Sequence, residues 1–219
     1  MNVRLHPAVR YLSVVTCALL VARSASAQAW AYPSLQPPRI ATREFNFGFA
    51  DAGNAGTSLL FQWREGLSRR DQLSLDAGIA DPDGKGLDNV VFFGGQYAHQ
   101  LVSASRDVPL DFLLTAGAGV AVGNKTTLRL PVGVSLGHRF PLEGDMAITP
   151  YAHPRISLDF CGGCKGDEAQ FGIAFDVGAN VELTRVIALR GSAFFGGSPR
   201  FGDDGLGLSV VWTPPALHR

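Results

Sequence analysis

Alternation of apolar with polar or small residues, at a period of two, runs through most of this 219-residue chain. Phe45, Phe47 and Phe49, for example, are separated by single residues that are charged, polar or small. Successive side chains of a β-strand point to opposite sides, so a period of two indicates strands with one apolar face. No stretch of comparable length has helical periodicity. The pattern therefore predicts an all-β fold.

Ten alternating segments follow one another between Thr42 and Trp212, separated by short turns rich in glycine, aspartate and asparagine. Their lengths are close to the about 9–11 residues of a tilted membrane-spanning strand. We predict a closed antiparallel transmembrane β-barrel of about ten strands; eight strands are an alternative if two weak segments do not span. The segments cover residues 44–49, 58–64, 72–79, 89–101, 111–122, 127–139, 148–159, 171–183, 187–195 and 206–212.

The direction of the apolar face follows from the chemistry of the other face. The second row is rich in glycine, serine and alanine, and the only lysines, Lys85, Lys125 and Lys165, fall in predicted turns. Small side chains fit a narrow lumen, whereas a water-facing surface carries lysine along its strands. We therefore expect the apolar row to face lipid. A soluble exported barrel that binds an apolar ligand inside is the alternative.

Three prolines disagree with uninterrupted strands. Pro131, Pro150 and Pro154 lie inside predicted segments, and proline cannot donate a hydrogen bond to a neighbouring strand. Pro150 and Pro154 are four residues apart, so their missing donors face the same neighbour. The sequence predicts either a bulged, weakly paired seam at this strand or misplaced segment boundaries.

The N-terminus has the three zones of a secretory signal peptide: a basic start, an apolar run from Tyr11 to Ala22, and small residues at Ala25 and Ala27. We predict cleavage between Ala27 and Gln28. The expected organisation is a signal peptide over 1–27, a periplasmic segment over 28–41, the barrel over 42–212 and a tail over 213–219.

Charge gives no reason to expect a nucleic-acid partner. The predicted signal peptide removes three of the 19 basic residues and no acid, which leaves 16 basic against 19 acidic residues in the mature chain. A slightly acidic protein lacks the positive field that attracts phosphate backbones.

The chain resembles the small outer-membrane β-barrel proteins, the group of OmpA-like, opacity-type and porin-like barrels. The resemblance rests on the signal peptide, the alternating segments, the run Ile148–Ala152 and the closing run Leu206–Trp212 with its aromatic end. It implies a bacterial outer-membrane location, lipid surroundings and insertion by the barrel-assembly machinery. Residues 213–219 depart from the family, whose chains commonly end at the aromatic residue.

Charged residues on the predicted lumenal row are nearly balanced in sign. In so narrow a barrel, balanced charge favours an internal plug of ion pairs, because enclosed charges must be paired. A narrow small-solute pore is the alternative. The predicted network comprises Glu44, Arg64, Asp76, Asp111, Arg129, Arg139, Arg155, Asp159, Asp176, Glu182 and Arg190.

Motifs for chemistry are few. Cys161 and Cys164 form a CxxC pair in a predicted loop, where an exported protein most often carries a disulfide. His153 and Ser157 share one row but lie about 13 Å apart along a strand, too far for direct activation. We expect no enzyme activity, no metal and no cofactor. The predicted function is a structural role or an interaction through the loops.

Overall fold

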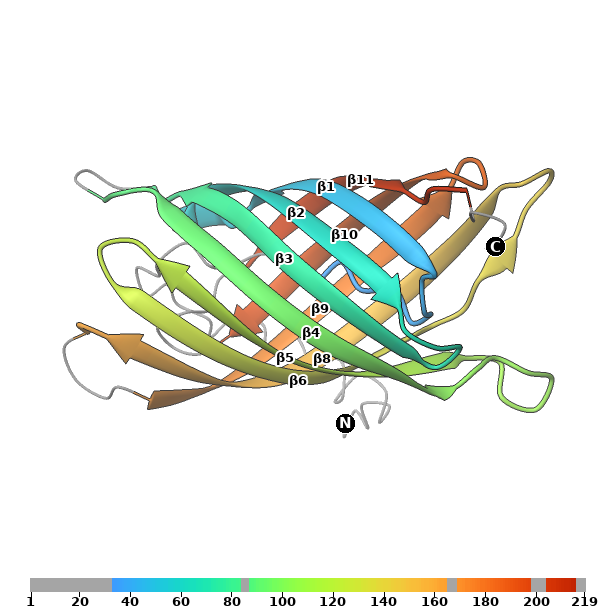
Figure 1. Cartoon of the computed structure of the whole chain (residues 1–219), viewed down its shortest axis with the longest axis horizontal. Helices are drawn as coiled ribbons and strands as arrows, with labels where there is room; N and C mark the ends of the chain where they lie inside the picture. The colour runs from blue at the N-terminus through green and yellow to red at the C-terminus, as the bar shows by residue number, and fades with distance from the viewer. Residues whose placement is uncertain (1–32, 84–86, 165–168, 198–203, 216–219) are drawn as a thin grey trace, which may run out of the picture.

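The computed structural model describes residues 33–83, 87–164, 169–197 and 204–215, and these residues form a closed antiparallel barrel of ten long strands (Figure 1). The prediction of about ten strands is confirmed. A two-residue strand, β7, continues the line of β6, and one 3-10 turn, η1, follows β1. The elements are β1 (Arg43–Asp51), η1 (Gly53–Ala55), β2 (Thr57–Gly66), β3 (Asp71–Asp81), β4 (Val90–Val102), β5 (Asp111–Val122), β6 (Thr126–Gly137), β7 (Phe140–Pro141), β8 (Ala147–Gly162), β9 (Ala169–Glu182), β10 (Ile187–Gly197) and β11 (Gly205–Trp212).

The ring is made by pairing each strand with its neighbours in sequence and by two further contacts. β1 pairs with β11 from Phe45↔Trp212 to Asp51↔Leu206, and β6 pairs with β8 past the short β7. Because the number of long strands is even, β1 begins and β11 ends at the same end of the barrel. We name this the terminal end, and the other the opposite end. In Figure 1 the strands run obliquely across the long axis of the molecule.

The apolar rows face outward. Leu206, Leu208 and Ile173 expose between 64 and 68% of their surface, whereas Arg64 and His153 expose 1% or less. A soluble barrel has the reverse arrangement, so the alternative of a soluble barrel with an apolar ligand inside is wrong. Hydrocarbon is the solvent that suits such an exterior, because exposed leucine and phenylalanine are stable in lipid.

The seam next to the prolines is interrupted, not bulged. Pairing between β6 and β8 stops after Gly133↔Arg155 and resumes at Leu136↔Ala152 with the same register. Pro154 lies in this gap, and Pro150 lies in the next one, before Phe140↔Ile148. Misplaced segment boundaries are therefore not the reason that prolines lie inside the predicted strands.

Residues 33–41 lie inside the barrel, and we name them the lumenal segment. They run along the lumen to the terminal end, where they lead into β1, and Pro33, Ser34, Leu35 and Gln36 are buried. The expected position of residues 28–41 was the periplasm. The described part of this stretch instead fills the lumen, because side chains on the inward rows supply hydrogen-bond donors to its backbone carbonyls.

An apolar cluster lies at the opposite end of the lumen. Leu60, Phe92 and Phe194 point inward from β2, β4 and β10, and each exposes 4% or less of its surface. Alanines from the strands and from η1 pack around them, and Leu35 joins the cluster from the lumenal segment. Only small or polar side chains were expected on the lumenal rows, so these large apolar residues were not predicted.

No helix within the described ranges has the length and apolar character needed to cross a bilayer. The predicted signal peptide, residues 28–32, and the loops around Lys85, Lys165 and Gly202 lie outside the described residues, as does the end of the C-terminal tail.

Candidate functional site

The lumen concentrates the polar chemistry of the molecule. Ten of the eleven predicted network residues lie on inward-facing rows of the strands, and Arg139 lies at the mouth just after β6. The network is not one continuous cluster. It divides into ion-pair groups stacked along the barrel axis, with the lumenal segment between them.

Glu44 is the centre of the largest group. Its carboxylate accepts hydrogen bonds from Arg64 at 2.5 Å and from Arg190 at 2.8 and 3.1 Å. The three side chains expose 6, 1 and 2% of their surface. One carboxylate is therefore shared by two buried cations, and further guanidinium N–H groups bond to the Ser34 and Leu35 carbonyls of the lumenal segment. Enclosed charges are tolerated only when such ion pairs and hydrogen bonds compensate for the lost water.

Three further pairs complete the charged lining. Arg129 binds Asp159 through two nitrogens at 2.8 and 3.0 Å, and Arg155 binds Asp176 at 2.7 Å. Arg139 binds Glu182 at 2.6 Å at the terminal mouth. Of the two predicted residues outside these pairs, Asp111 accepts the backbone N–H of Ala104, and Asp76 borders a small cavity.

Ser34 of the lumenal segment connects β8 with β9. Its backbone N–H and its hydroxyl both donate to Asp176 Oδ2, at 2.9 and 2.6 Å. Because the hydroxyl proton is directed at the carboxylate, Nδ1 of His153 donates to Ser34 Oγ, at 2.6 Å. Nε2 of the same ring then accepts from the Thr115 hydroxyl, at 2.9 Å. The relay Thr115–His153–Ser34–Asp176 is buried throughout.

The rest of the lumenal segment is held in the same way. Gln62 and Arg64 donate to the Ser34 carbonyl, and Gln96 donates to Gln36 Oε1 at 3.2 Å. Ser135 donates to the Gln36 carbonyl at 2.6 Å. Nearer the terminal end, Gln100 donates to the Pro38 carbonyl and the Ala41 N–H donates to Gln72. Side chains of seven strands thus contact this segment, from β2, β3, β4, β6, β8, β9 and β10.

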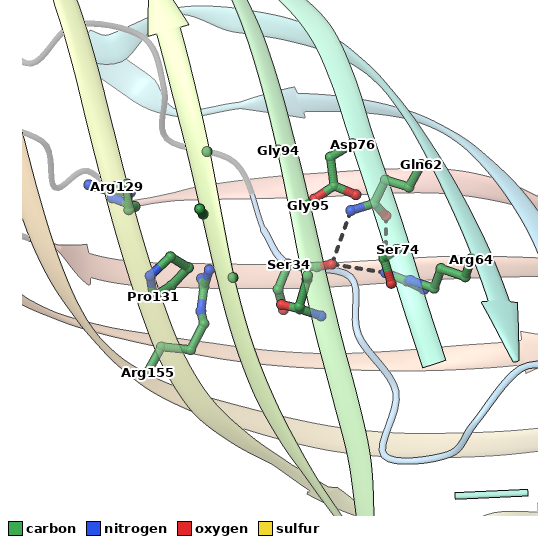
Figure 2. Close-up of a pocket in the computed structure, with 14 residues that line it drawn as sticks. Ser34, Gln62, Arg64, Ser74, Asp76, Gly94, Gly95, Arg129, Pro131 and Arg155 are labelled. Atoms are coloured by element: carbon green, nitrogen blue, oxygen red, sulfur yellow. Dashed lines mark hydrogen bonds between the residues drawn. The ribbon is translucent and has the colours of Figure 1, made fainter. Parts of the chain in front are cut away.

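One small polar cavity remains beside the segment. Figure 2 shows Ser34 between Arg129 and Arg155 on one side and Gln62, Arg64 and Asp76 on the other. The cavity has a volume of about 50 Å³, and glycines of β4 and β5 form part of its wall. A water molecule needs about 10–15 Å³ measured in this way. The cavity therefore has room for a few waters and not for a solute passage.

At the terminal mouth, the lumen widens on either side of the lumenal segment. One recess of about 310 Å³ lies against β9 and β10, and another of about 260 Å³ lies beside Gln100, His138 and Arg139. Arg39 borders both recesses. Leu35 and Gln36 line neither recess and are fully buried deeper in the lumen.

The other candidates have the following positions. Neither Ser157 nor Asp159 is a hydrogen-bond partner of His153, whose bonds go to Ser34 and Thr115, and His153 has no exposed surface with which to contact a substrate. In the described part of the chain, no group of three or more residues could hold a metal ion. Cys161 and Cys164 lie at the opposite end with Cα atoms 5.7 Å apart, a disulfide distance.

The lumenal segment is the element that sequence reasoning missed. Residues 28–41 have no strand periodicity and contain three prolines, which is typical of an external linker. A signal was nevertheless present: Gln62, Gln72, Gln96 and Gln100 occupy inward rows of three adjacent strands. Enclosed amides require donors and acceptors from a partner, and the backbone of an inserted segment provides both.

Comparison with known proteins gives fold likeness at low identity. No protein-family model and no curated protein matches the chain. Among solved structures, it is similar to a bacterial polysaccharide outer membrane secretin (TM-score 0.46, 10% identity, 73% of this chain covered) and spans 57% of that chain. It is also similar to the beta domain of the Bordetella autotransporter BrkA (0.48, 14%, 78% of this chain and 99% of that one) and to LpxR from Salmonella typhimurium (0.46, 12%, 78% and 100%). Likenesses of this size carry no inference about function.

Proposed function

We propose that this chain is an integral barrel of a bacterial outer membrane whose lumen is sealed by its own N-terminal segment. The observation that carries the proposal is the burial of Ser34, Leu35 and Gln36 among side chains of the inward rows. The role that fits a filled barrel is structural or an interaction through its ends, without enzyme activity and without conduction.

Three layers support a sealed lumen. The Arg139–Glu182 pair lies at the terminal mouth, the lumenal segment and the Glu44 group fill the middle, and Leu60, Phe92 and Phe194 close the opposite end. A solute would have to displace the lumenal segment, which would leave buried charges and carbonyls of the middle layer without partners, and then the apolar cluster at the opposite end.

The membrane location rests on the exterior. The outward rows carry leucine, isoleucine and phenylalanine at mid-height, and charged residues begin at the strand ends, such as Glu65 at one end and Asp81 at the other. An apolar band bounded by charge at both ends matches a bilayer core of about 30 Å between two polar interfaces. Under this proposal the terminal end faces the periplasm.

Conductance tests the seal. Mature protein (residues 28–219) is inserted into planar bilayers, and a variant that lacks residues 28–41 serves as the opened control, provided that its gel mobility still changes on heating as a folded barrel's does. We expect no ionic current through the mature protein and single-channel current steps through the shortened one. Steady steps from the mature protein would favour the alternative, a narrow small-solute pore.

Fractionation tests the location separately. We expect the protein to sediment with outer membranes and to migrate differently on gels before and after boiling. Recovery in the periplasmic fraction would contradict the membrane proposal, whatever the conductance result.

A further inference from the structure

The wall of the barrel has one seam with repeated interruptions. Between β6 with its continuation β7 and strand β8, pairing is lost at two places, after Gly133↔Arg155 and after Gly137↔Tyr151. By contrast, the β1–β11 seam pairs without a break from Phe45↔Trp212 to Asp51↔Leu206.

Proline explains the interruptions. Pro154 and Pro150 lie one in each gap, and neither has an N–H to donate to the neighbouring strand. Pro131 has the same effect on the other side of β6, where the β5–β6 pairing stops after Ala116↔Val132 and resumes at Gly119↔Arg129. β6 is therefore incompletely paired on both of its edges.

The lumenal segment makes hydrogen bonds at the first gap. If the register is continued through that gap, Ser135 faces His153. Ser135 donates to the Gln36 carbonyl at 2.6 Å, and His153 donates to Ser34 Oγ at 2.6 Å. The two residues that fail to pair with each other are thus both bonded to the same short segment, two positions apart, from the lumen side.

Burial makes these bonds strong determinants of local stability. Ser135 and His153 have no exposed surface, and neither has Gln36. A buried hydrogen bond with no water to replace it costs more to break than an exposed one. In a membrane, the surrounding lipid offers no donors or acceptors either.

We infer that residues 34–36 form a brace that holds the interrupted β6–β8 seam closed, and that Ser135 and His153 are its intramolecular binding site. Release of the brace opens the wall at this seam toward the bilayer. The inference goes beyond the sealed lumen, because it concerns the wall and does not depend on whether the barrel conducts.

Hydrogen exchange followed by mass spectrometry tests the brace in the mature protein in lipid nanodiscs. Ser135→Ala removes the bond on the β6 side and Ser34→Ala removes the hydroxyl on the β8 side. Ser209→Ala is the matched control, because Ser209 is a buried inward serine on β11, in the uninterrupted seam. Folding of each variant is verified by gel mobility.

We expect amides of residues 132–137 and 151–156 to exchange about tenfold faster in both test variants, the factor that corresponds to one lost hydrogen bond. Amides of β1 and β11 should be unchanged, and Ser209→Ala should leave the β6–β8 seam unchanged. Equal acceleration around the whole barrel, or no acceleration at the β6–β8 seam, would overturn the brace and leave the conductance result untouched.

Discussion

Arg190 donates to both carboxylate oxygens of Glu44, at 2.8 and 3.1 Å, although β11 lies between their strands. The long guanidinium side chain passes across the lumen face of β11 and links two strands that share no backbone pairing. Lumenal ion pairs therefore connect strands of the barrel in addition to the backbone hydrogen bonds of its wall.

Glu44→Gln tests how much this ion pair contributes to the free energy of unfolding. The substitution keeps the size of the side chain and removes the negative charge that bonds directly to the buried cations Arg64 and Arg190. We expect the free energy of unfolding to fall by about 3–5 kcal/mol, the usual consequence of breaking a buried ion pair. Urea unfolding in lipid vesicles, followed by tryptophan fluorescence, measures the change.

The control for Glu44→Gln is Glu65→Gln. Glu65 pairs with Arg43 on the outside of the barrel, and the two side chains are 23 and 47% exposed. Water and salt screen such a pair, so little change in stability is expected. Equal effects of the two substitutions would contradict a special role for the lumenal group.

Gly133→Ala tests the close packing at the β6–β8 seam. A Cβ at this position would lie 2.6 Å from Cγ of Arg155, 2.7 Å from the Pro154 carbonyl and 2.9 Å from Nε2 of His153. Something must shift, and overpacking of this kind costs about 1–3 kcal/mol. The expected result is a lower urea midpoint with an unchanged slope.

Gly94→Ala is the matched control for Gly133→Ala, since Gly94 also faces the lumen from a mid-strand position. The nearest atom to an added Cβ there is 3.5 Å away, which is ordinary contact. The packing argument fails if this substitution destabilises the protein as much as Gly133→Ala does.

Leu208→Arg tests the orientation of the apolar rows. Leu208 lies at the middle of β11 and exposes 68% of its surface outward. An arginine at the centre of a bilayer costs about 2–4 kcal/mol in a membrane barrel, and the cost falls to about 0–1 kcal/mol near the interfaces. Thr57→Arg, at the first residue of β2, should therefore be tolerated. If both substitutions are tolerated in vesicles, lipid does not surround β11.

The cysteine pair gives a redox prediction. Apart from Cys17 in the predicted signal peptide, the sequence contains only Cys161 and Cys164, and their Cα atoms are 5.7 Å apart. We expect that protein unfolded without reductant takes up no thiol label, and that two labels per chain appear after reduction. Labelling without reductant would show that the disulfide had not formed.

Much of the wall was predictable from local pattern. A strand period of two requires only that each face meets one environment, so rows such as Phe45, Phe47 and Phe49 identify the strands. The small and polar residues of the other row indicate which face points outward. Pro150 and Pro154 indicated weak pairing along one edge of their strand, because a missing donor has the same effect in any antiparallel pairing, but they did not tell which strand lies at that edge.

The interior was less predictable, because its contacts join residues far apart in the sequence. Ser34 and His153 are separated by 119 positions, and neither has a neighbour in sequence that indicates the other. Phe92 and Phe194 alternate with outward-facing phenylalanines, so their own segments read as apolar on both faces. Closure of the barrel brings the side chains of Phe92 and Phe194 into one cluster at the same end of the lumen.

The β1–β11 seam also constrains the order of folding. It joins Phe45 to Trp212, so the cylinder cannot be completed until the last strand has been delivered. Contacts of such long sequence separation form slowly. Pro33 to Ala41 must already be in place at that moment, because insertion after closure would require threading past buried ion pairs. Enclosure of residues 33–41 by the last strand is thus a late step of assembly.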